Sequence, residues 1–407
     1  MSSADMTSNF KKDFPFIINN QNDIYFDSAA TTHRPAKVIN AIKDFLEKDY
    51  ATVSRGLYTK SVEATMKYES VRAQVADFIL APSPNEIIFT PSATQSINLV
   101  AQSWGRANLN ADDCIILSEM EHHANIVPWR QLADEIGFNI FVTKLNSKLE
   151  LDLNRFKKLL EHKPKLVSIV HLSNVLGALN PVKEICALAK EFGAVTLIDG
   201  CQAVSDNKVD VKDMGCDFYV FSGHKIYGPN GIGVLYGREE ILKDMPPFIG
   251  GGDMIEDVSF DKITYLPAPH RFEAGTPNIE GVIGLGAALT YLSDIGMDKV
   301  YEYKSKLIAL IKQGLASIER VEMLGGNHHG LISFQVRGLH VHDVGSMMAA
   351  KNIALRAGQH CAQPLFDSLG ISGSLRVSVG LYNDESDVEK FINALKDVIA
   401  FFEKRGL

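Results

Sequence analysis

The chain has 407 residues, of which 46% are hydrophobic and 22% charged, so it can bury a large core and holds more than one lobe. Its formal net charge is −8 and no run of Lys or Arg supplies a basic patch, which argues against nucleic-acid or anionic-membrane partners. The first twenty residues lack the apolar core of a secretory signal and the Arg-rich character of a transit peptide. We therefore expect a cytoplasmic protein that acts on small molecules.

Between about residues 60 and 237, helical periodicity alternates with short β-rich runs, the pattern of a mostly parallel sheet covered by helices. The predicted strands are EIIFT, DCIILSE, NIFVTKL, KLVSIVHLS, AVTLID, DFYVFS and IGVLYG. The predicted helices between them are 94–104, 126–136, 152–160 and 181–192. This order indicates an α/β fold.

A smaller α+β unit is predicted after Gly296. Its elements are a helix at 300–318, a strand at 331–336, a helix at 343–353, a strand at 375–380 and a final helix. The final helix has one continuous apolar face, and Ser386 with Glu389 has capping-box spacing at its start. We expect three parts: an N-terminal segment, 1–22, that packs with the small domain; a large domain, 23–295; and a small C-terminal domain, 296–407.

Polar side chains follow the predicted strands at the points where they end. These residues are Thr94, His122, Asn174, Asp199 and Lys225. In an open α/β sheet, ligands bind beyond the carboxyl ends of the strands. We therefore expect the five side chains to converge on one edge of the sheet.

Asp199 and Lys225 are the most informative pair in this set. Asp199 closes an almost wholly apolar strand, where a carboxylate needs a cation or a strong donor. One interpretation is a buried ion pair with Lys225, and the other is that both side chains contact a third body. Pyridoxal phosphate fits the second interpretation, because it needs a lysine for its Schiff base and an acid at the pyridinium nitrogen.

The neighbouring residues suit the rest of that cofactor. A phosphate needs a helix N-terminus and hydroxyl donors, which Thr94, Ser222 and His224 can supply. His122 is placed to stack on the ring. Alone, each signal has another explanation: Gln202 can cap a turn, and His122 with His123 can be a solvated pair.

The longer motifs resemble one family. The segments are EHHANIVPW (121–129), HLSNVLGALNPV (171–182), DGCQAVS (199–205), FSGHKIYGPNGIGVLYG (221–237), GGGDMIEDV (250–258), RFEAGTPNIEG (271–281) and RAGQHCA (356–362). They resemble the Suf-type, or group II, cysteine desulfurases, which are pyridoxal-phosphate enzymes of the class V aminotransferase group related to selenocysteine lyases. The resemblance runs from YFDSAATTHRP (25–35) to the C-terminus and so covers nearly the whole chain. It implies the fold-type I architecture of pyridoxal-phosphate-dependent transferases.

The resemblance also implies a role for each residue of a cofactor site. Lys225 would be the Schiff-base lysine, Asp199 would pair with the pyridinium nitrogen, and Gln202 would bond the ring hydroxyl. The remaining cofactor contacts would come from His122 against the ring and from Thr94, Ser222 and His224 at the phosphate. Thr276 would reach the phosphate of the other subunit, which implies a homodimer.

On the substrate side, the resemblance implies that Asn174, Arg376 and Arg356 bind the substrate. Cys361, in the small domain, would be the nucleophile that accepts sulfur as a persulfide. The implied reaction converts L-cysteine to L-alanine, and the sulfur would pass to an acceptor protein of the SufE or SufU kind for iron-sulfur cluster assembly. The sequence itself supports the assignment of Cys361, because Arg356 and His360 stand close by and positive charge lowers a thiol pKa.

Several alternatives stay open. Within the same chemistry, the substrate is L-selenocysteine or cysteine sulfinate instead of L-cysteine. From other classes, the chain is a pyridoxal-fold scaffold protein, or a metalloenzyme that uses His122, His123, His340 and His342. The presence of both Lys225 and Asp199 argues against the scaffold protein.

The sequence departs from the family pattern at three places. Where relatives commonly have HRGxH, this chain has the run from Ser54 to Tyr58, without either histidine. The loop PSATQSIN (91–98) has Ala93 in place of a hydroxyl residue and Gln95 in place of a glutamate. The residues before Cys361 are Gln359-His360 instead of two histidines.

Overall fold

A computed structural model describes residues 10–406 of the chain. Residues 1–9, which include the first part of the expected N-terminal segment, lie outside the described residues. The centre of the fold is a seven-stranded sheet in the order β2-β8-β7-β6-β5-β3-β4. The strands are β2 (Ile87–Thr90), β3 (Cys114–Ser118), β4 (Asn139–Thr143), β5 (Leu166–Val170), β6 (Val195–Asp199), β7 (Phe218–Ser222) and β8 (Gly233–Gly237). All seven predicted strands are confirmed.

The sheet is mostly parallel, as predicted. Strands β4, β3, β5, β6 and β7 run parallel to one another, whereas β8 pairs antiparallel with both β7 and β2. Strands β3, β5, β7 and β8 are buried along their whole length. Strands covered on both faces read as continuous apolar runs, which is why the sequence revealed them.

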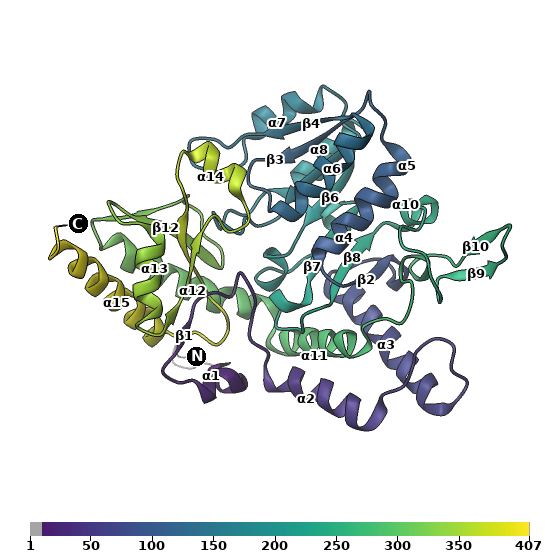
Figure 1. The fold of residues 1–407 in the computed structure, drawn as a ribbon, viewed down its shortest axis with the longest axis horizontal. Coiled ribbons are helices and arrows are strands. Elements are labelled where there is room, and N and C mark those ends of the chain that lie inside the picture. The colour runs from purple at the N-terminus through teal and green to yellow at the C-terminus, as the bar shows by residue number, and fades with distance from the viewer. Residues whose placement is uncertain (1–9, 407) are drawn as a thin grey trace, which may run out of the picture.

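Helices cover both faces of the sheet (Figure 1). One core packs the sheet against α3 (Thr59–Phe78), α7 (Leu153–Leu160), α8 (Val182–Glu191) and α11 (Ile279–Ile295). The other core packs it against α4 (Ala93–Val100), α6 (Val127–Ile136) and α10 (Glu239–Asp244). The other helices of this part are α2 (Ala36–Asp44), α5 (Arg106–Asn108) and α9 (Val211–Met214). The four predicted helices match α4, α6, α7 and α8, except that α4 ends at Val100 and a π-helical turn follows it.

The residues after Gly296 form a second unit with its own sheet and core, which we call the C-terminal unit. Its strands, in spatial order, are β11 (Val321–Met323), β12 (Leu331–Val336), β15 (Ser374–Ser378) and β14 (Arg356–Gly358), all antiparallel. Its helices are α12 (Met297–Ala316), α13 (Val341–Ala349), α14 (Gln363–Leu369) and α15 (Glu385–Glu403).

The capping box of α15 differs from the prediction. Asp384 is the N-cap residue, and the side chains of Asp384 and Asp387 each accept a hydrogen bond from the other's backbone N–H. Ser386 lies inside the first helical turn. The predicted capping box was therefore placed two residues too late in the chain. Asp at the N-cap with Asp three residues later satisfies the same two backbone donors.

The described residues before α2 contact both parts of the molecule. Strand β1 (Ile24–Tyr25) pairs with β13 (Ile353–Ala354) of the C-terminal unit. Helix α1 (Pro15–Asn19) follows Phe14, whose ring packs against Tyr291 of α11 and against Tyr382. On the opposite side of the molecule, β9 (Ile255–Val258) and β10 (Ile263–Tyr265) form a protruding hairpin (Figure 1). Within residues 10–406, no helix is long and apolar enough to cross a membrane.

Candidate active site

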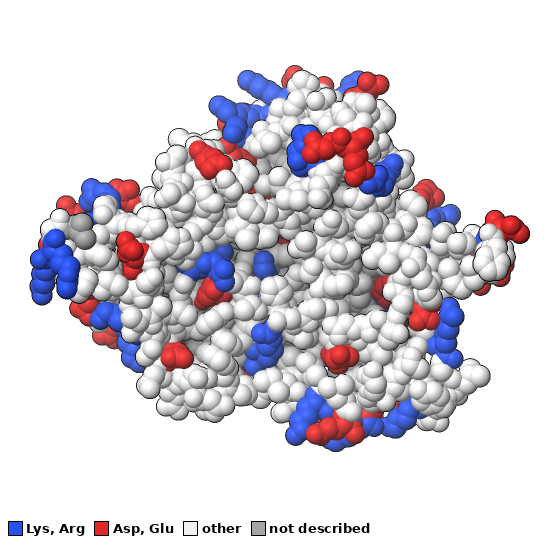
Figure 2. Space-filling view, viewed as in Figure 1, with Lys and Arg blue, Asp and Glu red and all other residues white. Residues whose placement is uncertain are grey.

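The carboxyl ends of the parallel strands open onto one cavity of about 340 Å³, which residues of the C-terminal unit close from the other side. Every site residue predicted from the sequence lines it except Thr276. The lining set is Thr94, His122, Asn174, Asp199, Gln202, Ser222, His224, Lys225, Arg356, Cys361 and Arg376. Figure 2 shows a hollow near the centre of this face, with basic and acidic side chains meeting at its edge.

One end of the cavity is the N-terminus of α4. Ser92 caps this helix by accepting a hydrogen bond from the backbone N–H of Gln95 over 3.2 Å. Strand β8 can approach this closely only through Gly233, because a Cβ there would lie 2.6 Å from the Cα of Ser92. A helix N-terminus with Thr94 and Ser222 beside it is a site for an anion such as a phosphate.

Asp199 and Lys225 face the same cavity without pairing. Asp199 is 4% exposed and accepts a hydrogen bond from the backbone N–H of Cys201 over 3.0 Å. Among the described residues, no ion pair or hydrogen bond joins Asp199 to Lys225, and the Lys225 ammonium has no partner. The interpretation of a buried Asp–Lys ion pair was therefore wrong, and both groups are free to contact a ligand.

Two histidines at the cavity are held neutral. Burial, together with the positive charge of Lys225, lowers the pKa of His122 to about 4, although the negative charge of Asp199 acts in the opposite direction. The His122 Nδ1 accepts a hydrogen bond from the backbone N–H of Ala124 over 3.1 Å, which fixes the proton on Nε2. Burial also lowers the pKa of His224 to about 4, with Lys225 and Arg34 acting in the same direction.

The segment after β1 forms part of the cavity wall and makes hydrogen bonds to the loop that carries Lys225. Gln202 donates from Nε2 to the carbonyl oxygen of Ala29 over 2.8 Å. The hydroxyl of Thr32 donates to the carbonyl oxygen of His224 over 3.0 Å and accepts from the backbone N–H of Tyr227 over 2.8 Å. The loop that carries Lys225 is thus fixed by residues almost two hundred positions earlier in the chain.

Arg376 lies at the junction of the two units with an incomplete set of partners. Its Nη1 donates to the backbone carbonyl of Asn174 over 2.9 Å, and its Nη2 lies 3.3 Å from a carboxylate oxygen of Asp27. The Nε of Arg376 and the Oδ1 of Asn174 are buried without a hydrogen-bond partner in the described structure. Burial lowers the pKa of Arg376 to about 10, so the guanidinium still carries its charge at neutral pH. Because buried polar groups are nearly always hydrogen-bonded, these two unpaired atoms mark a place where a ligand can bind.

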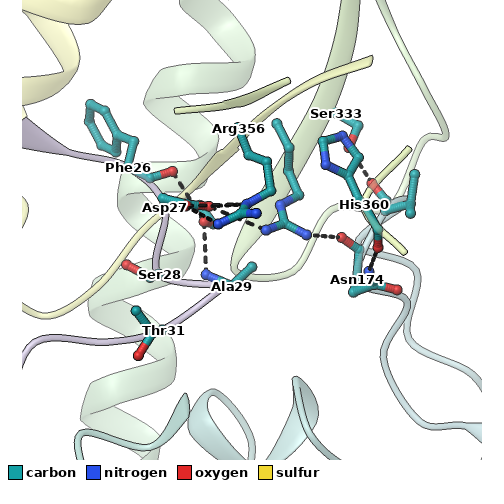
Figure 3. Close-up of polar contacts among 12 residues, drawn as sticks. Phe26, Asp27, Ser28, Ala29, Thr31, Asn174, Ser333, Arg356 and His360 are labelled. Atoms are coloured by element: carbon teal, nitrogen blue, oxygen red, sulfur yellow. Dashed lines mark hydrogen bonds and ion pairs between the residues drawn. The ribbon is translucent and has the colours of Figure 1, made fainter. Parts of the chain in front are cut away.

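The loop that bears Cys361 is anchored at three points. Asn174 donates from Nδ2 to the carbonyl oxygen of His360 over 2.7 Å (Figure 3), and the backbone N–H of His123 donates to the carbonyl oxygen of Cys361 over 2.8 Å. The backbone N–H of Gln363 donates to the ring Nε2 of His123 over 3.0 Å. His360 and Cys361 both have positive φ, 51° and 57°, a conformation that side chains adopt only where the surroundings hold them in it.

Cys361 is the one exposed cysteine among the five, all of which are free thiols. Burial raises the pKa of each of the other four thiols, which are Cys114, Cys186, Cys201 and Cys216. A thiolate is the nucleophilic form of cysteine. The exposed position at the cavity therefore makes Cys361 the candidate nucleophile.

Thr276 lies apart from the cavity. It lines a second cavity of about 200 Å³ together with Gln95, Phe248 and Ile249. Of the departures from the family pattern, Tyr58 and Gln95 do not line the main cavity, whereas Ala93 does. Tyr58 is more than half exposed, and Ala93 offers its backbone N–H to the hydroxyl of Ser222 over 2.9 Å.

The histidines of the metalloenzyme alternative do not come together at the cavity. His122 lines it, whereas His340 caps the start of α13 and accepts a hydrogen bond from the backbone N–H of His342. In the part of the chain that the structure describes, no group of three His, Cys, Asp or Glu side chains is placed to hold a metal ion.

The sequence analysis did not single out Asp27, and it named His123 without recognising its role at the Cys361 loop. Asp27 contacts both Arg356 and Arg376, and His123 holds the Cys361 loop. The signal for Asp27 was available in principle, since two arginines predicted for one pocket require a counter-charge. Nothing in the local sequence around His123 indicates its partner, because Gln363 lies 240 positions away.

Comparisons with known proteins agree with this geometry. Residues 24–391 match the family model described as Aminotransferase class-V. The chain is 45% identical over 405 residues to a probable cysteine desulfurase of Synechocystis sp., covering 98% of this chain and 96% of that protein.

Two solved structures have the same fold over almost the whole chain. A cysteine desulfurase of Escherichia coli, CsdA in an S-sulfonic acid form, superposes with a TM-score of 0.91 at 38% identity and covers 96% of this chain and 98% of its own. The apo structure of a cysteine desulfurase from Thermococcus onnurineus superposes with a TM-score of 0.93 at 38% identity, over the full length of both chains.

Proposed function

The chain belongs to the class V aminotransferase family, a family of pyridoxal-phosphate enzymes of fold-type I, and we propose that it is a cysteine desulfurase. It converts L-cysteine to L-alanine and takes the sulfur onto Cys361 as a persulfide. The observation that carries this proposal is one cavity that contains an unpaired lysine and a buried carboxylate, with an arginine whose Nε lacks a partner and the one exposed cysteine among the five.

The residues at the cavity fit the cofactor. The α4 N-terminus with Thr94 and Ser222 would hold its phosphate, and the neutral ring of His122 would stack on its pyridine ring. Asp199, buried and with one backbone donor, would hold the pyridinium proton. When bound, the cofactor supplies an electron sink for the carbon atoms of the substrate.

The protein's own side chains bind the substrate and transfer the protons. Arg376 donates from its unpaired Nε to the substrate carboxylate, and Asn174 can donate to the same group from the second N–H of its Nδ2, which fixes the orientation of the amino acid. Lys225, once its amine is free, takes the proton from Cα and returns one later in the reaction. Because Lys225 has no ion-pair partner in the cavity, no ion pair is broken when its ammonium group gives up a proton.

Sulfur transfer is the step assigned to Cys361. Its thiolate attacks the substrate sulfur, so that a sulfur–sulfur bond forms as the Cβ–sulfur bond breaks. The electron pair of the broken bond stays with Cβ, which takes up a proton to become the methyl group of alanine. The anchors on His360 and Cys361 limit the motion of the nucleophile, and positioning of this kind can be worth about 7–11 kcal/mol.

A second copy of the chain completes the assembly that we propose. Large apolar side chains are exposed on α3, the 57–58 loop, the 248–249 loop and the β9–β10 hairpin, with Leu57 98% exposed, and α3 and the hairpin lie at the same end of the molecule (Figure 1). A patch of this kind marks an interaction surface. Thr276 lines a cavity together with the exposed Phe248 and Ile249, and in a homodimer it would reach the phosphate site of the partner.

The exposed Cys361 also suits a sulfur acceptor of the SufE or SufU kind, which would collect the persulfide for iron-sulfur cluster assembly. A persulfide pathway needs reduced thiols, and all five cysteines are free, which supports a cytoplasmic location.

Purified protein loaded with cofactor and supplied separately with L-cysteine and L-selenocysteine tests the proposal. We expect alanine from both, and a higher rate on L-cysteine when an acceptor protein is present. Alanine from L-selenocysteine alone would identify a selenocysteine lyase and overturn the desulfurase assignment.

A further inference from the structure

Asn174 lies in a short hairpin, residues 172–179, between β5 and α8. The two ends of this Asn174 hairpin pair at an antiparallel bridge between Leu172 and Leu179. At its tip, the hydroxyl oxygen of Ser173 accepts hydrogen bonds from two backbone N–H groups over 3.1 and 3.3 Å. These bonds fix the shape of the hairpin. They do not fix where its tip lies relative to the rest of the cavity.

The C-terminal unit holds the tip through two side chains that are neighbours in its sheet. Ser333 on β12 and Arg376 on β15 are directly opposite in the antiparallel register, so their side chains lie on the same face. Arg376 donates from Nη1 to the carbonyl oxygen of Asn174 over 2.9 Å. The hydroxyl of Ser333 donates to the next carbonyl oxygen, that of Val175, over 2.6 Å (Figure 3). One cross-strand pair thus holds two successive carbonyl groups.

A third hydrogen bond extends this contact along the hairpin. The backbone N–H of His329 donates to the carbonyl oxygen of Gly177 over 3.0 Å. Gly177 has a φ of 64°, and a Cβ there would lie 2.7 Å from the carbonyl oxygen of Leu331, so the hairpin and β12 meet too closely for a side chain. The position of Asn174 is therefore set by the C-terminal unit, although Asn174 stands far earlier in the chain.

Ser333 is the donor in this contact that the proposed reaction does not use. It is fully buried, and its neighbours Ile332 and Phe334 belong to the core of the C-terminal unit. The side chain of Val175 is also fully buried, in the core of the central sheet. Without the hydroxyl, the Val175 carbonyl loses its donor in a place where an unsatisfied acceptor is costly. The backbone directly after Asn174 is then free to shift.

A shift at this point reaches the substrate through the Asn174 amide. One N–H of its Nδ2 donates to the carbonyl oxygen of His360 over 2.7 Å, and the second is the one assigned to the substrate carboxylate. That carboxylate has to meet the unpaired Nε of Arg376 at the same time. Two donors from different segments can share one carboxylate only if the backbone keeps them in register.

We propose that Ser333 is a positioning residue for the substrate carboxylate, and that its hydroxyl holds the Asn174 amide in register with Arg376 by fixing the Val175 carbonyl. This inference rests on the proposed function, since it takes Asn174 and Arg376 as ligands of the substrate carboxylate. It assigns part of the substrate affinity to a side chain that does not line the cavity.

Binding of L-alanine to the cofactor-loaded enzyme tests the proposal, with titration calorimetry as the measurement. Ser333→Ala should weaken L-alanine about fivefold, the equivalent of one net hydrogen bond. Gln335→Leu is the matched control. It removes another side-chain hydrogen bond from β12 to a backbone carbonyl, that of Gly373 over 2.8 Å, and should leave the Kd unchanged. An unchanged Kd in Ser333→Ala, or an equal loss in Gln335→Leu, would overturn the proposal.

Two further variants show how Ser333 acts. Ser333→Cys keeps a weaker donor and should weaken L-alanine less than Ser333→Ala does; the reverse order would show that packing, and not the hydrogen bond, sets the affinity. In an Asn174→Ala background, the effect of Ser333→Ala should largely disappear. An equal effect in both backgrounds would show that Ser333 acts through Arg376 alone and would contradict the proposal.

The L-alanine titrations also separate this inference from the proposed function. If wild-type enzyme made no alanine from L-cysteine, the desulfurase assignment would fail, yet the titrations would still show whether Ser333 acts through Asn174. If the enzyme makes alanine and Ser333→Ala binds L-alanine as wild type does, the desulfurase assignment stands and the inference about Ser333 is wrong.

Discussion

The backbone N–H of His123 donates a hydrogen bond to the carbonyl oxygen of Cys361 over 2.8 Å, so the turn after β3 holds the loop of the C-terminal unit that bears the nucleophile. The ring of the same histidine accepts from the backbone N–H of Gln363 over 3.0 Å. One residue thus ties the cofactor side of the cavity to both sides of Cys361.

His123→Ala should loosen the Cys361 loop while cofactor binding persists. The substitution removes the ring acceptor and leaves the Gln363 N–H without its partner, a loss of about 1 kcal/mol. Alanine formation should fall about fivefold, and Cys361 should react faster with an aromatic disulfide reagent because its loop opens more often. His123→Asn, which keeps an acceptor, serves as the control. Unchanged thiol reactivity in His123→Ala would argue against the anchoring role.

The fold and most of the cavity could be predicted because their signals are local. The strands are short apolar runs, and the ends of parallel strands necessarily meet at one edge, which brings Asp199 and Lys225 to one cavity. The contacts that could not be predicted join distant segments. Asp27 is 329 positions from Arg356, and no periodicity or spacing encodes such a pair. Thr276 lies outside the cavity of its own chain, so a single chain cannot show its role.

The buried pair of Lys304 and Asp206 should contribute strongly to stability. Both side chains are 6% exposed, and they join α12 to the loop after β6. Lys304→Met should destabilise the protein by about 3–5 kcal/mol, because it leaves a buried carboxylate without its cation. Thermal unfolding measures the loss. Lys183→Met is the matched control, since it removes an ion pair with Asp213 that is mostly exposed and should change stability by less than about 1 kcal/mol.

Stability should fall as the pH is lowered from about 7 toward 4, in part because of His171. Burial lowers the pKa of His171 to about 4, so between about pH 6.5 and 4 the unfolded chain binds a proton there that the folded chain does not. Unfolding is favoured wherever the unfolded state binds more protons. His171→Gln should therefore lose less stability than wild type between pH 7.5 and 5, by up to about 2 kcal/mol in urea unfolding. Parallel stability-against-pH curves for the two proteins would show that folding does not lower the pKa of His171.

The most direct test of the desulfurase assignment is the location of the sulfur. Wild-type enzyme exposed briefly to L-cysteine without reductant should carry one added sulfur on the Cys361 peptide, as detected by mass spectrometry, and Cys361→Ala should carry none and form almost no alanine. Recovery of that sulfur on Cys114, Cys186, Cys201 or Cys216, or turnover of L-cysteine by Cys361→Ala at the wild-type rate, would contradict the assignment.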